Sequence, residues 1–176
     1  LAEAYAADDR EEEAQVYFDS SLESVAKEAP QKSLEVKERA ADFYGKNNLY
    51  DKEIELRKKS LEELDLLKSS SKKKNETPKS TTVDPITSQR INYKIANTLI
   101  VQDKLDEAIP YLEKSITEAA TDDDLVVQKD ATRRLSEVYD NKGNYTKALD
   151  SYKKYAAVAD TLYARKEQEI ARAERL

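Results

Sequence analysis

The sequence contains no cysteine, histidine, methionine or tryptophan. Without cysteine and histidine the chain cannot form disulfides or the common zinc sites. It also lacks the thiol nucleophile and the imidazole base on which many hydrolases depend. Two separated glycines leave no glycine-rich phosphate loop, and the acidic runs 11–13 and 122–124 lack the spacing of a metal-binding loop. We therefore predict that the chain is not an enzyme and carries no catalytic, cofactor-binding or metal-binding residues.

Residues that interrupt regular structure are also scarce, with two glycines and four prolines among 176 residues. Few runs alternate Val, Ile and Thr as strands do. Long helices joined by short turns, and thus an all-α fold, are expected. No apolar run approaches the roughly 20 residues of a membrane span, so no membrane contact is expected within these residues. The sequence starts at Leu1 without Met, inside an expected helix, which predicts a fragment of a longer protein.

Charge is unevenly distributed around the net value of −6. Residues 1–30 hold nine acidic and two basic side chains, whereas residues 68–83 hold five basic and one acidic. The basic segment is rich in Ser and Lys and has no aromatic side chain, so residues 69–84 are expected to form a flexible loop. Phosphate contacts need a broad basic surface, and no nucleic acid is expected as a partner. A nucleic-acid-binding helical repeat that uses Lys72 to Lys74 is the least favoured alternative.

One pattern of residues recurs along the chain and is clearest in KGNYTKALDSYKKY, residues 142–155. The pattern consists of four positions at offsets 0, 4, 13 and 17, and the copies begin 39, 55 and 40 residues apart. The four copies are Leu1, Tyr5, Ala14 and Phe18; Ala40, Tyr44, Glu53 and Arg57; Ile95, Leu99, Ala108 and Leu112; and Leu135, Tyr139, Ala148 and Tyr152. Such repetition predicts helix pairs that bury their apolar faces against neighbouring pairs.

The copies resemble tetratricopeptide repeats, in which two antiparallel helices cross closely at small residues. On the first helix of each pair the small position is held by Ala2, Ala41, Ala96 and Ser136. In the second copy Glu53 and Arg57 replace a small and an aromatic residue, an exception to the tight packing expected elsewhere. The resemblance implies a single domain, residues 1–176, with the fold of a helical-hairpin solenoid. Its expected parts are about three and a half repeats (1–30, 34–68, 86–120 and 128–160) and an extended C-terminal helix, 145–176.

Turns are expected at residues 8–10 and 45–49, the latter containing Gly45. Pro30 is expected to end or follow the second helix of the first copy. Asp84 and Pro85 indicate entry into the third helix pair, because Asp caps helices and Pro suits a first turn.

The end of the chain carries a second resemblance. Its segment YKKYAAVADTLYARKEQEIARAE is similar to the end of the repeat region in membrane-anchored sensor histidine kinases and related regulators of Bacteroidetes-type bacteria. The matching residues are Tyr152, Lys153, Tyr155, Asp160, Thr161 and Leu162. This resemblance implies a sensory module of a larger bacterial signalling protein in a two-component system. It favours a periplasmic or other extracytoplasmic location, with a cytoplasmic one left open.

The same tail carries an incomplete heptad of Leu162, Ile170, Ala173 and Leu176. A connector to a coiled coil or output domain, self-association through this helix, and a polar capping helix are all compatible with that pattern.

The concave surface of such arrays is lined by outward positions of the first helices. Here those positions are acidic in the second copy, neutral in the third and of both signs in the fourth: Glu38 and Asp42; Tyr93, Asn97 and Ile100; and Arg133, Glu137 and Asp140. Asn97, Arg133 and Arg134 supply part of the clamp that holds a terminal carboxylate in chaperone-binding tetratricopeptide domains. The acidic Glu38 and Asp42 do not fit the remaining clamp positions. The candidate partner-binding residues are Tyr93, Asn97, Arg133, Arg134 and Glu137.

The sequence thus predicts a module that binds a protein or peptide partner in its groove. A free-standing scaffold or adaptor without signalling output is the alternative.

Overall fold

A computed structural model describes residues 11–28, 30–71 and 86–176. Every regular element in these ranges is an α-helix: α2 Glu11–Glu28, α3 Pro30–Lys46, α4 Tyr50–Ser71, α5 Ser88–Val101, α6 Leu105–Thr121, α7 Leu125–Asn141 and α8 Tyr145–Glu174. The contacts divide the chain into two compact units, residues 1–87 and 88–176. The predicted all-α fold is confirmed, while the assembly of all repeats into one domain stays a prediction.

Some predicted features lie outside the described residues: the first helix of copy one, the turn at 8–10, most of the basic loop, and Asp84 and Pro85. The loop was predicted to begin at residue 69, but α4 continues through Ser71. Pro30 is the first residue of α3, where its fixed φ angle suits a helix start and its missing N–H has no helical partner to lose.

In unit 1, α2 and α4 pack against α3. The small residues Ala14, Ala40 and Ala41 are fully buried, and they lie in one apolar cluster with the rings of Phe18 and Phe43. The two ring centroids are 5.3 Å apart and the ring planes are tilted by 39°. The predicted core role of the small positions is confirmed for Ala14 and Ala41, because zero exposure leaves no room for a larger side chain at these crossings.

The exceptional second copy replaces apolar packing with buried charge. Arg57 on α4 is 4% exposed, and its guanidinium donates to Glu38 at 2.8 Å and to Asp42 at 2.8 Å, both on α3. Glu53, one turn earlier on α4, lies 3.6 Å from Arg57 and is also 4% exposed. The hairpin is therefore held by a compensated charge cluster where other copies use a small and an apolar residue.

Gly45 was placed in a turn by the sequence, yet α3 continues through Lys46 and Gly45 is helical. A Cβ atom at Gly45 would lie 2.9 Å from both carboxylate oxygens of Glu53. Glycine is needed here because Glu53 occupies the space next to the α3 backbone. The large side chain of Glu53 on α4 is thus accommodated because Gly45 on α3 has no side chain.

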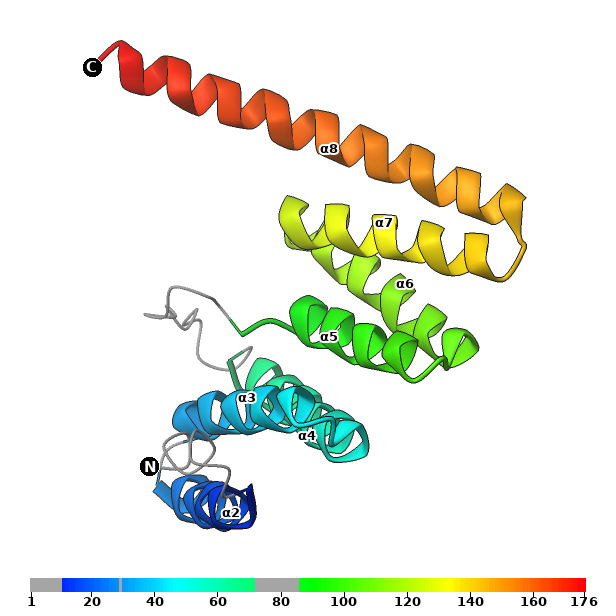
Figure 1. Ribbon diagram of the computed structural model, residues 1–176. Helices are drawn as coiled ribbons and strands as arrows, with labels where there is room; N and C mark the ends of the chain where they lie inside the picture. The colour runs from blue at the N-terminus through cyan, green and yellow to red at the C-terminus, as the bar shows by residue number, and fades with distance from the viewer. Residues whose placement is uncertain (1–10, 29, 72–85) are drawn as a thin grey trace. The chain divides into compact units, whose positions relative to one another are not determined.

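Unit 2 consists of two hairpins, α5 with α6 and α7 with α8, in which each helix runs antiparallel to the next (Figure 1). Its core contains Ile91, Ile95 and Leu112 and the fully buried Ala96 and Ala108, as the repeat pattern predicts. Ser136, the small residue of α7, donates from Oγ to the carbonyl oxygen of Ala148 on α8 at 2.8 Å. Small residues therefore mark the close crossings of both hairpins.

The tight turns share one backbone motif despite the scarcity of glycine. Residues with positive φ are Asn48, Asp103, Asp123 and Gly143, at 59°, 59°, 55° and 76°. In each turn the following N–H donates to a carbonyl oxygen five residues back, as from Asn144 to Tyr139 at 2.9 Å. This is the Schellman arrangement, and Asn and Asp tolerate its left-handed residue better than other side chains do.

Candidate protein-interaction surface

One side-chain hydrogen bond in unit 2 joins two helices that are not consecutive in the sequence. Arg134 on α7 donates from Nε to Oδ1 of Asn97 on α5 at 2.9 Å, and from Nη1 to Oε2 of Glu137 at 3.1 Å. α5 and α7 are the first helices of their hairpins and pack against each other. Asn97 and Glu137 therefore fix the Arg134 guanidinium between the two helices.

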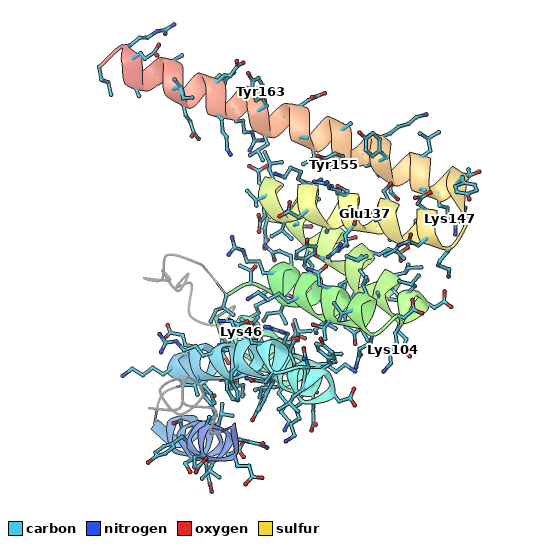
Figure 2. The ribbon with its side chains drawn as sticks, in the orientation of Figure 1. Lys46, Lys104, Glu137, Lys147, Tyr155 and Tyr163 are labelled. Atoms are coloured by element: carbon cyan, nitrogen blue, oxygen red, sulfur yellow. The ribbon has the colours of Figure 1, made fainter. Side chains whose placement is uncertain are left out.

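Arg133 extends this network toward α8. Its Nε lies 3.5 Å from Oε1 of Glu137, and its guanidinium carbon lies 5.9 Å from the centroid of the Tyr155 ring. Figure 2 shows Glu137 on α7 and Tyr155 on the side of α8 that faces α7. The Arg133 side chain is 65% exposed, so its guanidinium is oriented by two neighbours and still open to solvent.

A further hydrogen bond sets the packing of α5 on α7. Gln89 near the start of α5 donates from Nε2 to Oδ2 of Asp124 at 3.1 Å. Asp124 is the N-cap of α7, and its other carboxylate oxygen accepts from the backbone N–H of Val127 at 3.2 Å. One carboxylate thus caps α7 and also fixes it to α5.

The structure joins four of the five candidate residues: Asn97, Arg133, Arg134 and Glu137. Tyr93 lies one turn before Asn97 on α5 and is half-buried; no hydrogen bond or ion pair among the described residues connects it to the other four. Partner binding by these residues stays a prediction.

Two other expectations about this surface change. Glu38 was expected to line a groove, but it is 8% exposed and paired with Arg57, so its charge serves packing in unit 1. Tyr155 was not among the candidates. Its position seven residues after the buried Ala148 places both on the side of α8 that faces α7, and this spacing could have identified it.

A cavity of about 340 Å³ lies between α6, α7 and α8. At its wall Tyr139 donates from its hydroxyl to Oε1 of Glu113 at 3.4 Å, and Nζ of Lys147 lies 5.5 Å from the Tyr139 ring centroid. Asp150 and Lys154 complete its charged lining. Burial raises the pKa of Tyr139, and the negative charge of Glu113 raises it further.

Unit 1 repeats this arrangement around a cavity of about 190 Å³, with Tyr44, Asp19, Lys52, Glu55 and Lys59 in the equivalent positions. Nζ of Lys52 lies 6.0 Å from the Tyr44 ring centroid, and burial and then the charge of Asp19 raise the pKa of Tyr44. Each cavity has two acidic and two basic side chains. This balance favours neither an anionic nor a cationic ligand, so the two cavities are best explained as a consequence of the repeated helix packing.

The part of the chain that the structure describes holds no group of three or more acidic, His or Cys side chains able to bind a metal ion. Within the same residues, none of the helices combines the length and apolar character needed to cross a membrane.

Comparison with known proteins places this geometry in context. A model of the family described as tetratricopeptide repeat matches residues 89–122 and 134–160. A search of curated proteins finds no match.

Solved structures show the same fold over most of the chain. One is the crystal structure of MamA, with a TM-score of 0.57 and 19% identity, covering 90% of this chain and 74% of that one. Another is a Podosopora anserina putative kinesin light chain with nearly identical TPR-like repeats, with a TM-score of 0.60 and 16% identity, covering 92% and 73%. The chain therefore carries tetratricopeptide repeats within unit 2 and has the all-α helical-hairpin fold of solenoids built from such repeats.

Proposed function

We propose that the chain is a protein-interaction module that binds an extended segment of a partner across α5 and α7. Tetratricopeptide repeats are in general scaffolds that bind other proteins, and stacked helix pairs offer continuous surfaces for this purpose. The observation that supports this location is the hydrogen bond from Arg134 to Asn97, which connects the first helices of two successive hairpins. The proposed contact residues are Tyr93, Asn97, Arg133, Arg134 and Glu137.

The geometry suits a partner segment that presents a carboxylate. Arg134 is held by Asn97 and Glu137 before any partner arrives, so little side-chain entropy is lost on binding. Arg133 is stacked near Tyr155 with its guanidinium exposed, and a guanidinium can bind a carboxylate through two parallel hydrogen bonds. Glu137 limits the positive charge and disfavours strongly acidic partners.

A peptide-display selection against the immobilised chain provides a direct test. The dissociation constants of the selected peptides are then measured for the wild type, Arg134→Ala and Asn97→Ala. Loss of a hydrogen bond to a charged group corresponds to a weakening of about tenfold. Lys114→Ala on α6 is the matched control, because Lys114 is exposed and paired with Glu118 at 3.9 Å.

Peptides that bind the wild type and the control equally but lose affinity for Arg134→Ala would support the site. Peptides that bind all four proteins equally would show that binding occurs elsewhere. A selection that yields no binder above background would count against peptide binding as the function.

A sensory role within a larger bacterial signalling protein is the finer form of this proposal. It is supported by the resemblance of the tail to sensor kinases and by α8, whose 30 residues exceed the 17 of α7. A free-standing scaffold is equally consistent with the repeats. Distances from a spin label at Arg172 to one on α5, measured with and without a selected peptide, separate the two: a shift supports signal output, and an unchanged distance supports a scaffold.

A further inference from the structure

An apolar stripe runs along α8 beside the face that packs on α7. Leu149, Tyr152, Tyr163 and Ile170 are 55%, 54%, 66% and 60% exposed. Figure 2 shows Tyr163 directed away from α7. Together with Ala156, Ala159, Lys166 and Ala173 they follow one another at alternating intervals of three and four residues, the spacing of a coiled-coil seam. This α8 stripe, residues 149–173, is roughly 36 Å long at 1.5 Å per residue.

A different side of α8 packs on α7. Ala148 and Ser151 are buried there, and Tyr155, Val158 and Leu162 continue that side as half-buried residues. The large apolar residues of the α8 stripe are therefore left exposed, while its Ala156 and Ala159 are half-buried beside the α7 contact. Contiguous exposed apolar surface of this kind marks an interaction site.

Equivalent positions elsewhere in the chain are covered by a helix. In the repeat pattern Tyr152 corresponds to Phe18 on α2, Arg57 on α4 and Leu112 on α6, which are 6%, 4% and 0% exposed. Helices α2 and α6 pack against the next helix in sequence, α3 and α7 respectively, whereas Arg57 is covered through its ion pairs to α3. Tyr152 is thus the one residue at this position of the pattern that is exposed.

We propose that a second copy of this chain occupies the α8 stripe, so that two α8 helices pair in antiparallel orientation. In an antiparallel pair that aligns Leu149 with Ala173 of the second copy, large residues face small ones at successive levels. Tyr163 then faces Ala159 of the second copy, and Lys166 faces Ala156 of the second copy. Tyr152 faces Ile170 of the second copy as the one large pair.

A parallel pair would have less favourable charge contacts and less complementary packing. It would bring Lys166 next to Lys166 of the second copy inside the contact. It would also set Ala156 and Ala159 against their own counterparts, which leaves a gap between the Tyr152 and Tyr163 levels. The sequence of the α8 stripe therefore selects the antiparallel orientation.

Charges beside the α8 stripe select the same alignment. Lys153 and Glu167 border it on one side, are exposed, and form no ion pair with any residue that the structure describes. In the antiparallel pair each Lys153 lies next to Glu167 of the second copy, which gives two ion pairs by symmetry. Asp160 lies on the two-fold axis next to its own counterpart, and this contact opposes association.

The test is the dimer dissociation constant, measured by sedimentation equilibrium on the full chain. Reversing one charge, Lys153→Glu or Glu167→Lys, turns two attractions into repulsions and should weaken association by about tenfold. The double variant Lys153→Glu with Glu167→Lys should restore the wild-type value. Asp160→Asn should tighten the dimer severalfold. All three positions are on the exposed surface of α8, and circular dichroism verifies that each variant keeps its helix content.

A second pair of variants tests the apolar contact. Tyr163→Glu should abolish the dimer, whereas Gln168→Glu adds the same charge on the opposite side of α8 and should leave it intact. A wild-type chain that stays monomeric at high concentration would overturn the proposal and leave the α8 stripe to a different partner. A dimer that Tyr163→Glu leaves intact, or that the double charge reversal fails to restore, would overturn it equally.

Discussion

Arg165, near the end of α8, forms a two-point ion pair with Asp123 in the turn before α7: Nη1 lies 2.7 Å from Oδ2, and Nη2 lies 3.3 Å from Oδ1. Asp123 itself has a positive φ of 55°. One exposed pair thus connects the distal part of α8 to the turn where α6 meets α7.

This pair makes a prediction about pH. The hydrogen bonds from Arg165, and then its charge, lower the pKa of Asp123 below its usual value of 3.8. Because the folded pKa is depressed, the stabilising contribution is fully present above the usual value and is lost as pH falls through the folded one. NMR titration of the Asp123 carboxyl should give a midpoint below 3.8 in the wild type. In Arg165→Ala the midpoint should rise toward 3.8, whereas Arg172→Ala should leave it unchanged; a wild-type midpoint of 3.8 would contradict the pair.

Gly45 and Glu53 should be coupled in stability. Gly45→Ala places a methyl group 2.9 Å from a carboxylate that is buried and held near Arg57, so we expect a loss of about 1–3 kcal/mol in the free energy of unfolding. In the background Glu53→Ala the same substitution should cost little. Urea denaturation of the four proteins in this cycle measures the coupling.

Gly143→Ala is the control for that cycle. Its φ of 76° disfavours alanine, but no atom lies within 4 Å of the added methyl group. We expect a loss of about 1 kcal/mol that does not depend on residue 53. Equal costs of Gly45→Ala with and without Glu53 would contradict the steric explanation.

Arg57 should be the most sensitive charged residue of unit 1. Arg57→Leu leaves Glu38 and Glu53 buried without their shared guanidinium, and breaking a buried ion pair costs about 3 kcal/mol. Lys59→Leu, which removes an exposed cation 3.8 Å from Glu55, should change the stability by less than about 0.5 kcal/mol. Denaturation curves of the two variants compare these effects directly, and similar losses would show that burial does not matter.

Tyr139 should ionise above pH 10. Burial, and then the charge and the hydrogen bond of Glu113, raise its pKa from 10.0. Because the folded pKa is raised, this contribution to stability is present below pH 10 and is lost as pH rises through the folded pKa. Ultraviolet titration of tyrosinate should show Glu113→Gln moving one ionisation back toward 10.0. Asp19→Asn should act on Tyr44 instead, and a titration that neither variant changes would contradict both contacts.

Much of the fold could be predicted because the repeat pattern reports burial. Ala108, Ile95 and Leu112 are all fully buried, as a spacing common to several copies requires. Gly45 could not be assigned correctly, because its role depends on Glu53 reaching it from the opposite helix. Sequence periodicity describes one helix at a time and contains no information about which side chain enters the space of its neighbour.

The candidate surface was predictable in part for a similar reason. Asn97 and Glu137 follow from helical positions counted along the repeat, and Arg134 follows from the resemblance to the carboxylate clamp. The structure places Arg134 within hydrogen-bonding distance of the other two. The same counting put Glu38 at the surface, because it could not reveal that Arg57 reaches back to α3. The incomplete heptad predicted for the tail shares Ile170 and Ala173 with the α8 stripe. It began at Leu162, however, which is half-buried on the α7 side, whereas the α8 stripe passes through the exposed Tyr163.

The length of α8 also has a mechanical consequence. Beyond Arg165, which Asp123 holds at the turn before α7, the helix continues to Glu174, over roughly 14 Å at 1.5 Å per residue. Movement of this end therefore depends on the Arg165–Asp123 pair as well as on the contact between Ala148 and Ser136. A tilt of about 10° beyond Arg165 moves the tip by on the order of 2 Å.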